Sequence, residues 1–201
     1  MCNDYGIDIP FSLFVEAFSQ IRLPIVFPTA PPNLEPRDEI WPTERAPVIR
    51  AAPGGVRLDQ VRWGLKSARP KGPPIINMRG EGRSFGPGRC LIPASHFYEF
   101  TGSGSPKTRW RFTKADEDWF CLAGFVGRGE SEGQAVEAFA MLTVAAGPDV
   151  APIHGRQVVV LERADWARWL DGDTDARGLI GSSPADCLRV VAAPRSKPPD
   201  L

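Results

Sequence analysis

The amino-acid sequence predicts an α+β fold in which strands are in the majority, built as a strongly curved, barrel-like and mainly antiparallel sheet with a few short helices. The 201 residues include 20 glycines and 21 prolines dispersed along the chain, which is typical of a loop-rich fold with many short strands. Many short runs are rich in β-branched and aromatic residues, as strands are. No internal repeat or domain boundary is evident, so we expect one domain over residues 1–193 and a C-terminal tail at 194–201.

Helical periodicity is confined to two segments. In residues 7–20 apolar side chains recur at i, i+3, i+4 and i+7, and in residues 165–170 two tryptophans and a leucine share one face. Residues 24–47 are rich in proline, and we expect extended loop or strand edge there. The predicted strands are 46–51, 56–63, 74–78, 89–93, 96–100, 109–113, 118–127, 136–145, 157–161 and 187–193.

Composition restricts the class of function only weakly. Basic and acidic residues number 24 each, so the net charge does not indicate a nucleic-acid partner, although a local basic groove would not change that sum. The apolar runs are too short to span a membrane and the first 30 residues lack the features of a secretory signal, so we expect a cytoplasmic protein. His96 and His154 have no obvious second ligand nearby, and we expect neither metal nor cofactor. The cysteines are scattered as in a reduced cytosolic protein, at Cys2, Cys90, Cys121 and Cys187.

Cys2 directly follows the initiator methionine. Removal of Met1 would leave an α-amine and a thiol on the same residue. A free α-amine titrates near ~7.7–8.0, so a useful fraction is unprotonated at neutral pH and can form a Schiff base with an aldehyde. The thiol can then close onto the imine carbon and give a five-membered thiazolidine. The alternative is a cysteine that occupies position 2 by chance.

Three further groups of residues could carry chemistry. Asn77 and Arg79 end a predicted strand, where an arginine fork suits phosphate oxygens; the alternative is a surface salt bridge between Arg79 and Glu81. Glu99 lies between two aromatic residues, and a desolvated carboxyl group there would have a raised pKa suited to acid–base work, unless it faces water. His154 lies in a loop between two predicted strands, as either a catalytic or a plain surface residue.

The order of these groups resembles the SRAP (SOS response-associated peptidase) family, whose members act as sensors of abasic sites. The resemblance covers residues 1 to about 170, and its most specific parts are the Arg89–Glu99 run and the Ile153–Arg156 element. The matching motifs are Met1-Cys2, Trp63-Gly64-Leu65, Asn77-x-Arg79-x-Glu81, Arg89-Cys90-Leu91-Ile92-Pro93-Ala94-x-x-Phe97-Tyr98-Glu99 and Ile153-His154-x-Arg156.

The resemblance implies a groove for single-stranded DNA and covalent capture of an abasic site as a thiazolidine through Cys2, by a monomer that is nucleoid-associated when bound to DNA. It implies that Asn77 positions the amine and substrate, that Glu99 handles protons, and that His154 assists proton transfer. The peptidase label refers to removal of Met1, and lyase activity through the same Schiff base is a further possibility. The residues expected to contact DNA are Arg79, Arg156, Trp63, Pro42 and Thr143, with core packing as the alternative for Trp63.

The chain departs from the family pattern at acidic positions. The family usually opens Met-Cys-Gly-Arg, whereas Asn3 and Asp4 follow Cys2 here, which puts one DNA backbone contact in doubt. Asp38 and Glu39 would repel phosphates if they faced the groove. We therefore expect the chemistry to be retained and the grip on DNA to be altered.

Two other functions remain open from the sequence. One is a thiol peptidase in which Cys2 is the nucleophile and His154 the base. The other is a non-covalent module that binds single-stranded DNA. Only thiazolidine capture requires the free α-amine as well as the thiol, so a blocked N-terminus separates it from both alternatives.

Overall fold

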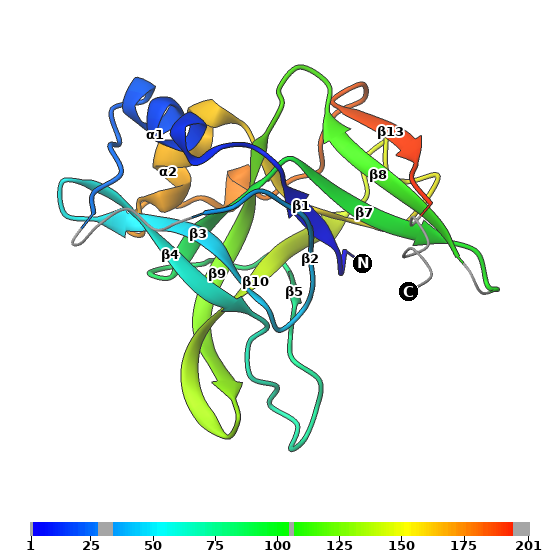
Figure 1. Ribbon diagram of the computed structural model, residues 1–201, viewed down its shortest axis with the longest axis horizontal. Coiled ribbons are helices and arrows are strands. Elements are labelled where there is room, and N and C mark those ends of the chain that lie inside the picture. Colours follow the sequence, from blue (N-terminus) through cyan, green and yellow to red (C-terminus); the bar gives the residue numbers. More distant parts are fainter. Residues whose placement is uncertain (1, 28–33, 105–106, 195–201) are drawn as a thin grey trace.

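Two β-sheets dominate the computed structural model, which describes residues 2–27, 34–104 and 107–194 (Figure 1). The strands of the first sheet's central part are β3 (Arg45–Ala52), β4 (Gly55–Trp63), β6 (Arg89–Ala94), β9 (Phe120–Ser131) and β10 (Gln134–Ala145). They pair in a closed cycle, because β10 contacts both β4 and β9 while β3 and β6 complete the ring. Only the β10–β4 pairing of this ring is parallel. The predicted curved, barrel-like and mainly antiparallel sheet is confirmed.

The second sheet is antiparallel throughout and has the order β13-β8-β7-β1-β2. Only Ser95 separates β6 from β7, so the chain passes directly from the barrel into this sheet (Figure 1). The sheet therefore holds the first residues of the chain against the barrel. Its strands are β1 (Tyr5–Ile7), β2 (Arg37–Ile40), β7 (His96–Thr101), β8 (Thr108–Lys114) and β13 (Leu188–Ala192).

Three short strands extend the barrel. β5 (Asn77–Arg79) pairs in parallel with Met141–Thr143 of β10, and β11 (Arg156–Val158) pairs in the antiparallel sense with Thr143–Ala145 at the same end of β10. β12 (Val160–Leu161) pairs with β9. The predicted strand at 157–161 is split because Val159 bonds to two neighbours: its N–H donates to Leu142 and its carbonyl accepts from Ala123.

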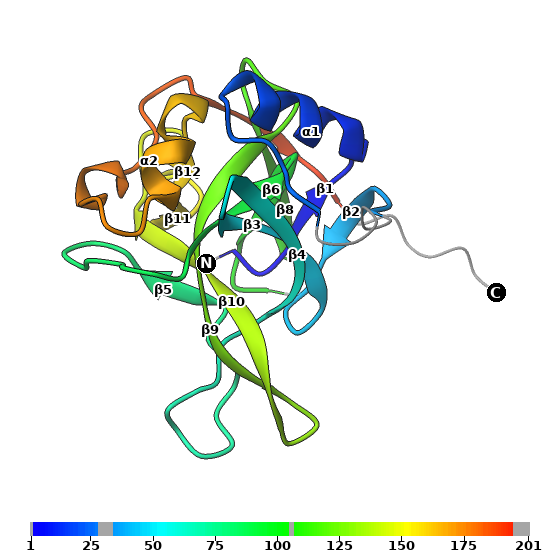
Figure 2. The ribbon, with the colours of Figure 1, turned by 90° about the vertical axis from the view of Figure 1, so that its left-hand side faces the viewer.

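Two helices cover the same side of the barrel, as the two ribbon views agree (Figure 2). α1 (Phe11–Gln20) begins after Pro10 and buries one apolar face, and α2 (Trp166–Leu170) follows a 3-10 turn. The helices meet where the rings of Phe18 and Trp166 stack at 5.1 Å. Both predicted helices are confirmed, although the first is shorter than 7–20 because the chain ahead of it pairs as β1. A second 3-10 turn spans Arg177–Leu179.

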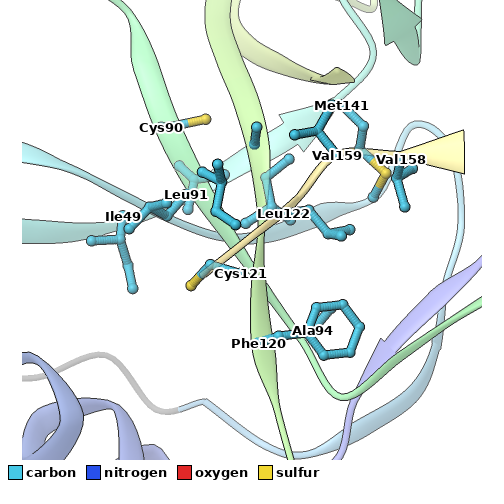
Figure 3. Close-up of a cluster of buried hydrophobic side chains, with 14 of the residues drawn as sticks. Ile49, Cys90, Leu91, Ala94, Phe120, Cys121, Leu122, Met141, Val158 and Val159 are labelled. Carbon is cyan, nitrogen blue, oxygen red and sulfur yellow. The ribbon is translucent and has the colours of Figure 1, made fainter. Parts of the chain in front are cut away.

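Apolar side chains from the barrel strands fill its interior (Figure 3). Each fully buried aliphatic side chain contributes about 1.5–3 kcal/mol through the hydrophobic effect, so this core is a major source of stability. The side chains labelled in Figure 3 are at most 1% exposed and are Ile49, Cys90, Leu91, Ala94, Phe120, Cys121, Leu122, Met141, Val158 and Val159. All four cysteines carry free thiols, in agreement with the expected reduced state.

Most predicted strands agree with the structure to within a few residues. The sequence did not predict β1 or β2, whose three and four residues are too short for a periodic pattern. β5 starts three residues later than the predicted strand at 74–78. The proposed tail at 194–201 falls outside the described residues except for Pro194, and Met1 also lies outside them. No helix in the described ranges is long and apolar enough to cross a membrane.

Candidate functional site

Cys2 is almost fully buried, with 1% of its surface exposed. Its segment continues the edge of β1 along β7, where the Tyr98 N–H donates to the carbonyl of Asp4 at 3.0 Å. The Cys2 thiol also donates to the Asp4 carbonyl, at 3.4 Å. On the other side, the Asn77 amide nitrogen donates to the Cys2 carbonyl at 2.6 Å. The backbone of Cys2 is therefore held from two directions, by the second sheet and by β5.

Burial raises the pKa of the Cys2 thiol well above its usual range, and the negative charge of Glu99 raises it further. The neutral thiol is therefore the dominant form at neutral pH. A cysteine nucleophile that acts by itself needs the opposite environment, with positive charge that stabilises the thiolate. The surroundings of Cys2 do not activate its sulfur directly.

Glu99 lies on β7 with 1% of its surface exposed. Burial raises the pKa of its carboxyl group, whereas the positive charge of His154 acts in the opposite direction. A raised pKa brings the carboxyl group closer to a state in which it can both donate and accept a proton near neutral pH. Because Glu99 influences the pKa of Cys2 and is itself influenced by His154, it links the two electrostatically.

His154 lies half-buried in the loop between β10 and β11, as the sequence predicted. Its Nδ1 accepts the backbone N–H of Arg156 at 3.0 Å, and the Arg156 carbonyl lies 2.9 Å from the same nitrogen. The neutral ring can therefore accept at Nδ1 and the protonated ring can donate there. Both protonation states therefore have a backbone partner at Nδ1.

The four predicted catalytic residues thus come from four separate parts of the chain. Cys2 precedes β1, Asn77 begins β5, Glu99 lies within β7 and His154 precedes β11. A hydrogen bond joins the first two, and the charge interactions described above link Cys2, Glu99 and His154. The structure brings all four together.

Arg156 is held by a network on neighbouring strands. Its guanidinium group binds both carboxylate oxygens of Glu81 and donates to the backbone and side-chain oxygens of Thr143, at 2.8 and 3.1 Å. This contact lowers the pKa of Glu81 to about 2. The salt bridge between Arg79 and Glu81 considered from the sequence is not the one formed, because Glu81 pairs with Arg156. Arg79 lies exposed on β5, opposite Thr143 on β10.

Two of the residues expected to contact DNA do not present their side chains. Trp63 is fully buried, its indole N–H donates to the Ile76 carbonyl at 3.0 Å, and its ring packs against Tyr5. Thr143 is 1% exposed, and its hydroxyl donates to the Met78 carbonyl at 3.3 Å. The expectation that these side chains contact DNA is wrong, because each points into the barrel wall. Pro42 is half-buried in the turn before β3.

Asp4 is fully buried and forms an ion pair with Arg109 at 2.7 Å. Arg109 also pairs with Glu39 at 2.5 Å, and its guanidinium carbon lies 3.4 Å from the centre of the Tyr98 ring. Both carboxylates therefore pair with Arg109, although the Glu39 side chain is 31% exposed. That Glu39 would repel phosphates if it faced the groove stays a prediction. Asp38 remains exposed. No sequence pattern predicts this cluster, because Asp4 and Arg109 are 105 residues apart.

The structure also corrects the expectation that neither histidine has a second ligand nearby. Asp8, Asp38 and His96 place side-chain ligand atoms within 4.8 Å of one another. The His96 Nε2 lies 2.9 Å from the Asp38 carbonyl, and its Nδ1 lies 2.9 Å from the Arg111 guanidinium. Burial lowers the pKa of His96, so the neutral ring is favoured. Both ring nitrogens are engaged by protein groups, which makes this cluster part of the sheet's own hydrogen bonding.

Fold and site together define a small β-barrel protein with a cysteine at position 2 beside an asparagine, a glutamate and a histidine. The chain belongs to the SOS response associated peptidase (SRAP) family, whose model matches residues 1–193. The resemblance inferred from the motifs is therefore confirmed.

Curated relatives and a solved structure extend this match. The abasic site processing protein YobE of Bacillus subtilis is 26% identical in an alignment of 186 positions that covers 85% of this chain and 82% of that protein. The abasic site processing protein YoqW of the same organism is 26% identical and covers 100% of this chain and 98% of its own. A crystal structure of a Bacteroides thetaiotaomicron protein has a TM-score of 0.75 at 14% identity, over 95% of this chain and 91% of that one, and shows the fold alone.

Proposed function

We propose that this protein recognises abasic sites in single-stranded DNA and captures them covalently through Cys2 once Met1 has been removed. The observation that carries the proposal is the hold on Cys2, whose carbonyl accepts from Asn77 at 2.6 Å while the buried Glu99 influences its thiol. The curated relatives YobE and YoqW, both called abasic site processing proteins, support the choice of substrate. The protein would act in the DNA damage response.

The chemistry begins at the amine, not at the sulfur. The unprotonated α-amine of Cys2 attacks the aldehyde carbon of the ring-opened sugar, and the resulting carbinolamine loses water to give an imine. The thiol then adds across the C=N bond, so a C–S bond forms and the thiol proton ends on nitrogen. Glu99 in its protonated form would donate the proton that lets water leave, and His154 would move protons to and from the sugar hydroxyl.

The electrostatics support this order over the thiol peptidase alternative. Burial and the charge of Glu99 raise the pKa of the Cys2 thiol, so few thiolate ions are present to attack a peptide carbonyl. An imine carbon is a much better electrophile than a peptide carbonyl, and a neutral thiol beside a carboxylate can add to it. The peptidase activity in the family's description would then be confined to removal of Met1.

Arg79 is the residue we propose as the phosphate contact beside the lesion. It is exposed on β5, two residues beyond Asn77. Arg156 is bound to Glu81 and Thr143, so it would reach a phosphate only by exchanging partners. Pro42, half-buried in its turn, would contact the flanking nucleotide by its ring.

The decisive experiment is intact-protein mass spectrometry after incubation with a single-stranded oligonucleotide that carries one abasic site. We expect a heat-stable adduct with the Met1-processed protein and none with Cys2→Ala or with an undamaged oligonucleotide. Cys187→Ala is the matched control, because Cys187 is the one cysteine among the described residues that is not buried, and it should leave the adduct unchanged.

A blocked N-terminus then separates the alternatives. Extending the chain by residues that cannot be removed should abolish the adduct, because the amine becomes an amide, while a simple thiol peptidase would keep its activity. Loss of the adducted strand as a cleaved product would indicate lyase activity from the same imine. If the processed wild-type protein forms no adduct, covalent capture is wrong and non-covalent binding of DNA becomes the better account.

A further inference from the structure

The loop between β4 and β5 lines a pocket of about 450 Å³ with basic side chains. Four cations, Arg62, Lys66, Arg69 and Lys71, border the pocket, and Glu130 is its one acidic neighbour. The loop extends from the barrel next to the β9–β10 hairpin in both ribbon views (Figures 1 and 2). This pocket is separate from the residues that surround Cys2.

The positive charge of this loop is only partly compensated within the protein. Lys66 pairs with Glu130, and Arg128 on β9 acts on the same carboxylate, lowering its pKa together with Lys66. Of the five cations Arg62, Lys66, Arg69, Lys71 and Arg128, Lys66 is the one for which an ion pair is formed in the described part of the chain. Arg69 and Lys71 are exposed and form no ion pair with any described residue. This local excess of positive charge indicates a surface suited to an anion, because the whole chain contains 24 basic and 24 acidic residues.

Hydrogen bonds within the loop hold it in shape. Leu65 and Ile75 exchange backbone hydrogen bonds of 3.0 and 2.9 Å at its base. Nearer the tip, the Gly72 N–H donates to the Arg69 carbonyl at 3.0 Å, and Lys71 adopts a left-handed backbone conformation with φ of 57°. The cations are therefore presented on an ordered turn, which lowers the entropy cost of binding.

The loop is tied to both sides of the candidate site. Its C-terminal end leads directly into Asn77, which holds Cys2. At its other end, Arg62 donates to the Thr43 carbonyl at 2.6 Å, in the turn that carries Pro42. The Arg62 Nε is buried and has no hydrogen-bond partner among the described residues. The Pro42 turn and Asn77 are therefore the two places where this surface adjoins the candidate site.

We propose that the basic loop, defined as residues 64–76 with Arg62 and Arg128, binds the phosphate backbone of the single-stranded DNA that flanks the abasic site. The inference rests on the proposed function for its ligand. Of the cations' neighbours in the loop, none is aromatic, so the surface offers charge without base stacking. It supplies affinity that is independent of base sequence and sensitive to salt.

The test measures non-covalent affinity in a Cys2→Ala background, so that crosslinking does not contribute. The variant Arg69→Gln/Lys71→Gln removes two cations from the loop, and Lys107→Gln/Arg189→Gln removes two exposed cations from the second sheet as a matched control. Each protein is titrated with single-stranded oligonucleotides of roughly 5 and roughly 16 nucleotides, the range of site sizes for small single-strand-binding folds. Exposed substitutions of this kind shift stability by only about 0.5 kcal/mol, so both proteins should remain folded.

We expect the loop variant to bind the longer oligonucleotide about 10-fold more weakly and to lose about 1.4 from the slope of log K against log salt, since each phosphate contact on a single strand contributes about 0.7. The short abasic oligonucleotide and the control variant should change less than about 2-fold. Equal losses for the loop and control variants, or no loss for the longer strand, would overturn the inference.

Further outcomes distinguish binding of flanking DNA from binding of a small anion, and they distinguish failure of covalent capture from failure of the loop proposal. If the loop variant loses affinity equally for the short oligonucleotide, or if inorganic phosphate at constant ionic strength displaces the longer strand, the loop is a small-anion site and the assignment to flanking DNA is wrong. If wild-type protein forms no abasic-site adduct but the loop variant still loses affinity for the longer strand, covalent capture fails while this inference stands. A normal adduct with unchanged affinity removes this inference alone.

Discussion

Arg109 in the second sheet and Arg69 in the basic loop are the same kind of residue in opposite surroundings. Arg109 is 7% exposed, pairs with Asp4 and Glu39, and lies against the Tyr98 ring. Arg69 is exposed and forms no ion pair with a described residue. The first arginine is neutralised inside the fold, whereas the second remains available to an outside anion.

The difference shows why the net charge of zero carries so little information here. At the second sheet, the carboxylates of Asp4 and Glu39 both pair with Arg109, whose side chain is 7% exposed. Among the residues that line the pocket at the loop between β4 and β5, Glu130 is the one acidic residue. The net charge of the whole chain does not show this difference between the two regions. The difference matters for binding a polyanion, because a phosphate group responds to the local charge and not to the total charge.

The strongest way to break the comparison is to remove Arg109. In Arg109→Ala the buried carboxylate of Asp4 loses its ion-pair partner, and uncompensated buried charges of this kind cost about 3–5 kcal/mol. We therefore expect the free energy of unfolding in urea to fall by about that amount. Arg69→Ala should change it by no more than about 0.5 kcal/mol.

A double variant separates loss of charge balance from loss of packing. Asp4→Asn/Arg109→Gln removes both charges and should recover much of the stability lost in Arg109→Ala. Arg177→Gln is the matched control, since Arg177 pairs with the exposed Asp175 at 2.8 Å and such pairs contribute about 0–1 kcal/mol. Equal destabilisation by Arg109→Ala and Arg177→Gln would contradict a special role for the buried pair.

The second prediction concerns Glu99, the other buried carboxyl group of the second sheet. Burial raises its folded-state pKa, so any stability it contributes is present below its unfolded pKa and is lost as the pH rises through its folded pKa. Glu99→Gln cannot ionise and avoids that loss. We expect the variant to gain stability relative to wild type as pH rises, by up to about 1.4 kcal/mol per pH unit between the two pKa values.

Urea denaturation of both proteins between pH 5 and pH 8 provides the measurement. The same variant should form the abasic-site adduct slowly at every pH, because the proton donor is gone. A stability difference that does not depend on pH would mean that the Glu99 pKa is not raised, and its proposed role in proton transfer would lose its electrostatic basis.

The sequence predicted the barrel because its strands are long enough to show a pattern. β9 and β10 have 12 residues each, and their apolar runs were recognised within a few residues of the observed ends. β1 and β2 form through pairing with distant parts of the chain, and a few residues cannot show the period of two that identifies a strand. Tertiary pairing, and not local propensity, determines them.

The candidate site divides in a similar way. Cys2, Asn77, Glu99 and His154 could be named because they stand in motifs that resemble those of the family, and the chemistry that we propose would use those side chains. Contacts made by common residues over long separations could not be named, and the pair of Asp4 with Arg109 is the clearest case. Trp63 failed as a DNA contact because an aromatic motif residue looks the same in sequence whether it packs inside or outside.

The third prediction concerns Arg156, whose charge is neutralised by Glu81. Glu81→Gln removes the carboxylate that binds Arg156. In the wild-type protein, the contact with Arg156 lowers the pKa of Glu81 to about 2. The stability that this ion pair contributes is therefore present above the unfolded-state pKa of Glu81 and is lost as the pH falls toward 2. Since Glu81 is 42% exposed, we expect a loss of at most about 1 kcal/mol at neutral pH.

Affinity for undamaged single-stranded DNA should rise severalfold in the same variant, with a steeper dependence on salt, because Arg156 can then bind a phosphate. Fluorescence anisotropy at several salt concentrations measures both quantities. Unchanged affinity would show that Arg156 serves only to fix the loop of His154.

The smallest expected effect comes from the loop itself. Glu130→Gln frees Lys66 from its exposed ion pair and removes the single acidic neighbour of the basic loop. Exposed pairs contribute about 0–1 kcal/mol, so stability should hardly change. Affinity for a strand of roughly 16 nucleotides should nevertheless rise about 2-fold, and the same substitution in Arg69→Gln/Lys71→Gln should give a smaller gain. A loss of affinity in Glu130→Gln would instead mean that the carboxylate orients Lys66 toward the ligand, and the loop would then be a positioned site and not a patch of uncompensated charge.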